Sequence, residues 1–164
     1  MAILVVDDSE DVRDIFEAVL TEGGYPDLMM ADSASAAFAL LALDQPQRTV
    51  PVDVIFLDVV MPGVDGIEAC ARIRRDPRYT EVPIVMSTSI DTMEGVDKAF
   101  EHGATDYLTK PLKVVDLMAC VRSNMRLKAD IDRRNAIGRE LLQHKPFCFA
   151  HLPDRGAPTG VWQS

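Results

Sequence analysis

Five polar side chains lie at the ends of strands that the sequence predicts. Asp7 and Asp8 follow the first strand, Asp58 follows the third, Thr88 closes the fourth and Lys110 closes the fifth. In an open parallel sheet the carboxyl ends of the strands share one edge, and ligands bind in the crevice outside that edge. We therefore expect three carboxylates, a hydroxyl and an ammonium group to lie in one crevice.

These residue types favour phosphate chemistry supported by a metal ion. Carboxylates that share a crevice raise one another's pKa unless a cation neutralises them. An all-oxygen set of ligands favours a hard divalent ion, and a site completed by water and phosphate oxygens suits Mg²⁺. Lys110 would add a movable positive charge and Thr88 a hydroxyl donor. Phosphoryl transfer to a carboxylate nucleophile requires such groups around it.

The strands that position these residues are predicted from apolar runs. Residues 3–6 and 54–57 are unbroken runs, and residues 84–86 form a shorter one. Continuous runs are typical of strands that are covered on both faces in a parallel sheet. Weaker signals indicate an edge strand over residues 28–31 and a short last strand over residues 106–109.

Segments with helical spacing separate the strands. Alternating strands and helices within about 125 residues indicate an α/β fold with an open, doubly wound parallel sheet and right-handed crossovers. The expected helices cover residues 12–20 with an end at Gly23-Gly24, residues 33–43, 66–75 and 92–102, and a last, extended one from residue 112 to about residue 141.

Four segments, in this order, are similar to the signatures of response-regulator receiver domains of two-component signal transduction. They are Val5–Asp8, Leu57–Gly66, Pro83–Thr88 and Gly103–Pro111. Four ordered motifs with the right element between each pair are far more specific than a single motif. The resemblance covers roughly residues 1–125. It implies a five-stranded parallel sheet in the order 2-1-3-4-5 with five helices.

The resemblance also assigns roles at the acidic crevice. Asp58 would be the phosphoacceptor. Mg²⁺ would be bound by Asp8, Asp58 and the backbone carbonyl of Val60, with Asp7 contributing directly or through water.

Further roles follow from the same resemblance. Lys110 would pair with Asp58 and then with the phosphoryl group, and the Lys110-Pro111 bond would be cis. Thr88 and Tyr107 would form the switch that senses phosphorylation and changes the face made by the fourth helix, fifth strand and fifth helix. The donor would be a sensor histidine kinase or a histidine phosphotransfer protein. Such a receiver catalyses only its own phosphorylation and dephosphorylation.

Two functions other than that of an independent receiver are also consistent with parts of the sequence. The chain could be the regulatory N-terminal receiver of a larger effector protein, because its last helix continues past Met125. It could instead be a Mg²⁺-dependent phosphohydrolase of the haloacid-dehalogenase type, which also uses an aspartate nucleophile. That family typically places a second acid two residues after the nucleophile, where this chain has Val60, so the sequence argues against it.

Charge limits the partners of the receiver segment. The 164 residues carry a net charge of −9, with 17 basic and 26 acidic side chains. Residues 1–125 hold 10 basic and 22 acidic groups, whereas residues 126–164 hold 7 and 4. An acidic surface repels the phosphate backbone of nucleic acids, so we expect no nucleic-acid binding by the receiver itself.

Cysteine content and hydropathy indicate a cytoplasmic protein without membrane contact. The three cysteines are an odd number without the spacing of a disulfide framework, which favours a reducing compartment. The first apolar run is cut off by Asp7 and Asp8, and the longest uncharged stretch, residues 33–43, is too short to span a bilayer.

The sequence suggests three segments. Residues 1–125 form the receiver domain, residues 126–145 a helical extension or linker, and residues 146–164 a flexible C-terminal tail rich in proline and glycine. Leu127, Ile131 and Leu141 continue an apolar stripe roughly at coiled-coil spacing. We therefore expect the chain to form a homodimer through the last helix and its extension.

Overall fold

The sheet has five parallel strands in the order β2-β1-β3-β4-β5. In this computed structural model the backbone is described for residues 1–89 and 93–144, and the side chains for residues 1–89 and 95–143. The order confirms the doubly wound sheet expected from the sequence. The strands are β1 (Ile3–Val6), β2 (Leu28–Ala31), β3 (Val54–Asp58), β4 (Ile84–Ser89) and β5 (Asp106–Lys110).

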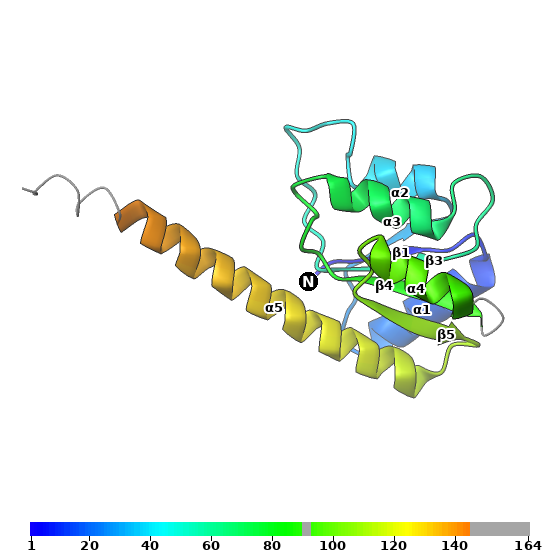
Figure 1. Ribbon diagram of the computed structural model, residues 1–164. Helices are drawn as coiled ribbons and strands as arrows, with labels where there is room; N and C mark the ends of the chain where they lie inside the picture. The colour runs from blue at the N-terminus through cyan, green and yellow to red at the C-terminus, as the bar shows by residue number, and fades with distance from the viewer. Residues whose placement is uncertain (90–92, 145–164) are drawn as a thin grey trace, which may run out of the picture. The chain divides into compact units, whose positions relative to one another are not determined.

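The described residues include five helices (Figure 1). Ser9, Ser33 and Asp65 cap the first three, because each side-chain oxygen accepts a hydrogen bond from the backbone N–H three residues further on. Such caps satisfy N–H groups that have no partner within the helix. The helices are α1 (Glu10–Glu22), α2 (Ala34–Leu40), α3 (Gly66–Arg75), α4 (Met93–Glu101) and α5 (Val114–His144).

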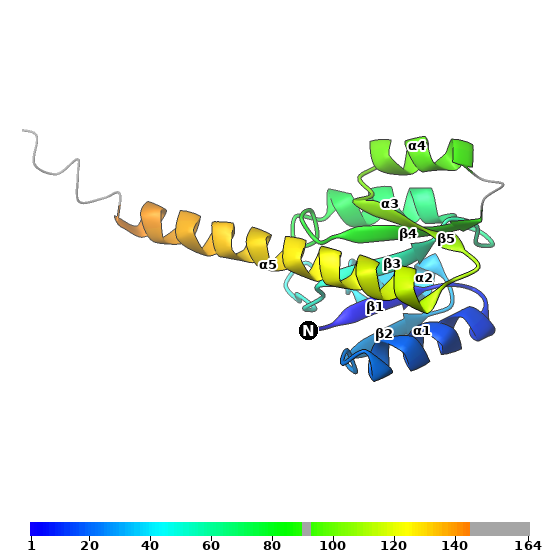
Figure 2. The same cartoon turned by 90° about the horizontal axis from the view of Figure 1, so that it is seen from below.

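Helices cover both faces of the sheet. α2, α3 and α4 lie over one face, and α1 and the beginning of α5 lie over the other (Figure 2). Side chains of β1 alternate between the two cores, with Leu4 and Val6 in the first and Ile3 and Val5 in the second. A strand buried on both faces needs an unbroken apolar sequence, which is the pattern that β1 and β3 have.

The chain divides into two compact units, Met1–Ile131 and Asp132–Ser164. The first unit contains the whole sheet. Segment boundaries at residues 125 and 145 stay a prediction, and the proposed tail, residues 146–164, lies outside the described residues. In the part of the chain that the structure describes, no helix has the length and apolar character needed to cross a membrane.

The C-terminal ends of α2 and α5 each differ by three residues from the sequence expectation. α2 ends at Leu40, three residues early, because Ala42 adopts a left-handed backbone conformation with φ of 52°. α5 continues through Gly138 and is described as far as His144. A glycine inside a helix costs only about 1 kcal/mol relative to alanine, which a helix of 31 residues tolerates.

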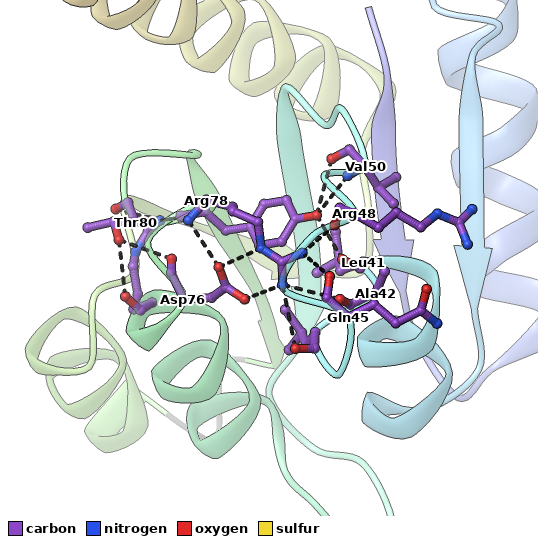
Figure 3. Close-up of polar contacts among 11 residues, drawn as sticks. Leu41, Ala42, Gln45, Arg48, Val50, Asp76, Arg78 and Thr80 are labelled. Atoms are coloured by element: carbon purple, nitrogen blue, oxygen red, sulfur yellow. Dashed lines mark hydrogen bonds and ion pairs between the residues drawn. The ribbon is translucent and has the colours of Figure 1, made fainter.

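Residues 41–53, between α2 and β3, form neither helix nor strand but are held in place by side chains from the loop after α3 (Figure 3). The Tyr79 hydroxyl donates to the Leu41 carbonyl at 2.7 Å and accepts from the Val50 N–H at 3.1 Å. Asp76 holds the Arg78 guanidinium at 2.5 Å. That guanidinium donates to the backbone carbonyl oxygens of Ala42, Leu43, Gln45 and Arg48.

Tyr79→Phe should loosen this segment. Tyr79 is buried, and removing its hydroxyl leaves the Leu41 carbonyl and the Val50 N–H without their shared partner. We expect the free energy of unfolding to fall by about 1–3 kcal/mol. Amide hydrogen exchange should also become faster over residues 41–53. Chemical denaturation and exchange mass spectrometry measure both effects.

Tyr25→Phe is the matched control. Tyr25 is partly buried against the core, and the described residues offer its hydroxyl no hydrogen bond. The control should leave both quantities unchanged. Equal stability of the two variants would show that the Tyr79 hydroxyl does not hold the segment.

Candidate functional site

The carboxyl ends of β1, β3 and β5 bring charged side chains to one edge of the sheet. Asp7 directly follows β1, while Asp58 and Lys110 are the last residues of β3 and β5. Because side chains alternate along a strand, Asp58 shares a face with Phe56, which packs in the core under α1 and α5. Ser87 lies opposite Asp58 in the β3–β4 register.

Lys110 joins two buried carboxylates at this edge. Its Nζ lies 2.9 Å from Asp7 Oδ2 and 3.2 Å from Asp58 Oδ1. Asp7 is 1% exposed and Asp58 is 5% exposed. Burial by itself would lower the pKa of Lys110, but the hydrogen bond with Asp7 and the negative charges of both aspartates raise it overall. Lys110 is therefore a firmly charged cation.

The Asp58 carboxyl is the most strongly perturbed acid of the site. Burial raises its pKa to about 6, and the neighbouring charge of Asp7 adds to the increase. Lys110 and a hydrogen bond from the Val60 N–H to Asp58 Oδ1, at 3.3 Å, oppose the increase without cancelling it. Near neutral pH the group is mainly ionised, although its pKa lies well above the ordinary value of 3.8.

Asp7, Asp8 and Asp58 could together hold a metal ion. One carboxylate oxygen from each lies within 4.8 Å of the others. Asp8 is exposed, so the cluster opens to solvent on its side. Three oxygen ligands without a nitrogen or sulfur donor fit a hard cation such as Mg²⁺ better than zinc, whose typical sites include histidine or cysteine. The residues present thus match the cation that the sequence predicts.

Gly66 allows α3 to begin directly against the carboxyl edge of the sheet. Its N–H donates to the Val59 carbonyl at 2.9 Å. A Cβ at this position would lie 1.9 Å from the Asp58 carbonyl oxygen, which no side chain can tolerate. The close approach of α3 to the Asp58 backbone therefore requires glycine at position 66.

The two predicted switch residues lie on neighbouring strands. Thr88 is buried near the end of β4, and its Oγ1 donates to the Ser89 carbonyl at 3.1 Å. Tyr107 on the edge strand β5 is 40% exposed, and its ring meets Phe100 of α4 edge-on at 6.3 Å. Tyr107 therefore contacts α4 through the ring of Phe100. The charged cluster itself consists of Asp7, Asp8, Asp58 and Lys110.

Sequence reasoning missed residues that support the cluster. The Ser9 N–H donates to Asp7 Oδ1 at 2.9 Å, and Arg13 Nη1 donates to the Asp7 carbonyl at 2.6 Å. Arg13 lies near the start of α1, where a cation opposes the helix dipole. That unfavourable position was a signal that the sequence offered. Ser87 was also missed: among the described residues its buried Oγ has no hydrogen-bond partner.

A parallel sheet in this order, with carboxylates and a lysine at its carboxyl edge, defines the flavodoxin-like receiver fold. The chain belongs to the response regulator receiver domain family, whose profile matches residues 3–122. It is therefore a receiver domain of the two-component response regulators, as the four motifs predicted. The cis bond expected at Lys110-Pro111 is present as well.

Curated relatives with similar sequences are longer than this chain. Response regulator PleD of Caulobacter vibrioides is 40% identical over 142 residues, which are 85% of this chain and 30% of PleD. The DNA-binding dual master transcriptional regulator RpaA of Synechocystis is 34% identical over 153 residues, or 93% of this chain and 59% of RpaA. The chain thus spans less than two thirds of either relative.

Solved structures give the same picture. Chemotaxis protein CheY4 of Vibrio cholerae superposes with a TM-score of 0.67 at 29% identity, covering 74% of this chain and 96% of CheY4. NtrX of Brucella abortus superposes with a TM-score of 0.72 at 26% identity, covering 83% of this chain and 29% of NtrX. The receiver fold thus matches nearly the whole of CheY4 but only one part of the longer NtrX chain.

Asp58→Asn should stabilise the metal-free protein above pH 6. The folded state holds the Asp58 proton up to a pKa of about 6, whereas the unfolded chain releases it near 3.8, so ionisation of Asp58 removes stability as pH rises through this window. Asparagine cannot ionise. Its advantage over wild type should therefore grow between pH 4 and pH 7 to about 1–2 kcal/mol.

Urea denaturation in EDTA at several pH values measures this difference. Asp44→Asn, an exposed change in the segment before β3, serves as the control and should show no such trend. A stability difference for Asp58→Asn that does not change between pH 4 and pH 7 would contradict the raised pKa.

Proposed function

We propose that the chain accepts a phosphoryl group on Asp58 from a sensor histidine kinase or a histidine phosphotransfer protein. The observation that carries this proposal is the position of Lys110 Nζ between Asp7 and Asp58. It gives the nucleophile a charged partner that can shift to incoming phosphoryl oxygens. Receiver domains as a family interact with histidine kinases or phosphotransfer proteins, which supports this choice of donor.

In the proposed transfer, a carboxylate oxygen of Asp58 attacks phosphorus and forms an O–P bond. The P–N bond to the donor imidazole breaks, and its electron pair remains on the nitrogen. Lys110 and the Thr88 hydroxyl would stabilise the transferred oxygens. Mg²⁺, held by Asp7, Asp8, Asp58 and the backbone carbonyl of Val60, would supply positive charge that offsets the charge of the phosphoryl group.

The proposed output is a change of the face formed by α4, β5 and α5. Thr88 would move toward the phosphoryl group, and Tyr107 would follow into the space that Thr88 leaves. The contact of Tyr107 with Phe100 supports this assignment, because a movement of Tyr107 must then alter the packing of α4. The chain would catalyse only its own phosphorylation and dephosphorylation, without a substrate that turns over.

A regulatory role within a larger effector protein is the second candidate. The length of the relatives supports it, since the chain corresponds to 30% of PleD and 29% of NtrX. A phosphohydrolase of the haloacid-dehalogenase type is disfavoured. Its second acid would stand at position 60, where the chain has a valine that is 63% exposed.

Asp58 should be the single phosphorylated residue, and its modification should require Mg²⁺. Intact-protein mass spectrometry after treatment with acetyl phosphate and Mg²⁺ should show one added phosphoryl group. EDTA should abolish it because the three carboxylates otherwise repel the donor. Asp58→Asn should prevent labelling, and the control Asp44→Asn should label normally. Label that persists in Asp58→Asn would refute the assignment.

The protein should self-associate through α5 and its extension. Leu127 and Leu141 lie two heptads apart on this helix, and Leu141 is 66% exposed. Ile131, which the sequence placed in the same stripe, is buried. Light scattering at high concentration should give the mass of a dimer, and Leu141→Lys should shift the equilibrium toward monomer.

Gln143→Lys introduces the same side chain at an exposed polar position of α5 and should leave the mass unchanged. A monomeric mass for the wild-type chain, both with and without phosphorylation, would rule out this mode of assembly.

A further inference from the structure

Asp7 is restrained at each of its three oxygen atoms. Its Oδ1 accepts from the Ser9 N–H at 2.9 Å, and its Oδ2 lies 2.9 Å from Lys110 Nζ. Its backbone carbonyl accepts from Arg13 Nη1 at 2.6 Å. Two of these contacts orient the side chain. The third, from Arg13, acts only on the backbone.

Asp8 is held differently. Its side chain is exposed, and among the described residues it has neither a hydrogen bond nor an ion pair. Its orientation therefore depends on the backbone that carries it. The Asp7 carbonyl and the Asp8 nitrogen belong to the same planar peptide group. Holding the Asp7 oxygen thus fixes the plane from which the Asp8 side chain departs.

Arg13 connects this peptide to α1. Its backbone N–H donates to the Ser9 carbonyl at 3.1 Å, and its guanidinium reaches back to Asp7. The Ser9 side chain in turn caps α1 by accepting from the Val12 N–H. Hydrogen bonds therefore hold the turn between β1 and α1 at Asp7, where it begins, and at Ser9, where α1 is capped. A charge-assisted hydrogen bond such as that from Arg13 is among the stronger kinds.

We infer that Arg13 is a positioning residue of the carboxylate cluster, which orients Asp8 for a divalent cation by fixing the Asp7–Asp8 peptide. This inference rests on the Mg²⁺-dependent function proposed above. Without Arg13 the peptide can rotate, and the cation must then order Asp8 as it binds. Removing the residue should weaken cation binding but leave the chemistry intact once the cation is bound.

An electrostatic role for Arg13 predicts the opposite sign. A guanidinium near the cluster repels a divalent cation, so its removal by charge alone would tighten binding. Positioning predicts that removal weakens binding. The direction of the change therefore separates the two roles.

The test compares Arg13→Met and Arg13→Lys with wild type in the full chain. Mg²⁺ alone is titrated and followed by amide NMR shifts. We expect Arg13→Met to weaken Mg²⁺ affinity by about tenfold, as is common when a residue that supports a metal ligand is lost. Arg13→Lys retains a charged donor and should recover part of the affinity. Arg75→Met, an exposed change on α3, should bind like wild type.

Acetyl phosphate labelling gives a second readout. The Mg²⁺ concentration for half-maximal rate should rise in Arg13→Met, whereas the rate at saturating Mg²⁺ should stay within about twofold of wild type. Unchanged or tighter Mg²⁺ binding in Arg13→Met would overturn the inference. A rate deficit that persists at saturating Mg²⁺ would overturn it as well.

The test still decides the role of Arg13 if Arg13→Met does not fold or if the wild-type chain is not phosphorylated. If Arg13→Met does not fold, Arg13→Lys and Arg13→Gln provide the comparison of affinities. If wild type binds Mg²⁺ but accepts no phosphoryl group, the proposed function fails, and the Mg²⁺ titrations still decide the role of Arg13.

Discussion

A single ammonium group holds two buried carboxylates together at the carboxyl edge of the sheet. Lys110 Nζ contacts both Asp7 and Asp58, which are separated from it by 103 and 52 positions along the chain. Two buried negative charges repel each other and lose hydration, so the cluster depends on a cation at this point. The strand order makes this contact possible, because Asp7, Asp58 and Lys110 all lie at the carboxyl ends of strands of one sheet. Lys110 at the end of β5 reaches past β4 to Asp58, at the end of β3, and to Asp7, which follows β1.

The same edge shows how closely chemistry and packing are combined. The charged residues lie at the ends of apolar strands that pack in the two cores. The Asp58 backbone is also packed against the start of α3 at Gly66. The burial of Asp58 in this packed edge also raises its pKa. In the phosphoryl transfer proposed above, such a poorly solvated carboxylate would be a stronger nucleophile than one in open water, with a cation to offset the charge of the phosphoryl group.

The sequence predicted the central strands β1, β3 and β4 well because they are buried on both faces and therefore consist of unbroken apolar runs. The outer strands β2 and β5 are less buried, and their signals in the sequence were weaker. The sequence also predicted α3 with both boundaries correct, and the structure shows that Asp65 caps this helix. The early end of α2 could not be predicted, because alanine at position 42 has no preference for a left-handed conformation. The position of Arg13 near the start of α1 was a signal in the sequence, but the backbone carbonyl that it binds could not be predicted. Carbonyl groups occur at every residue, so the sequence does not reveal which of them a side chain will bind.

The segment before β3 illustrates a further property of such contacts. Tyr79 and Arg78 bind it through main-chain atoms of Leu41, Ala42, Leu43, Gln45, Arg48 and Val50. Every amino acid supplies a carbonyl oxygen, and every one except proline supplies the N–H that is needed at position 50, so these contacts do not depend on the side chains at the exposed positions of the segment. Its exposed residues are therefore free to diverge during evolution while the backbone keeps its course. In this part of the receiver, the exposed side chains can change without a change in the conformation of the backbone.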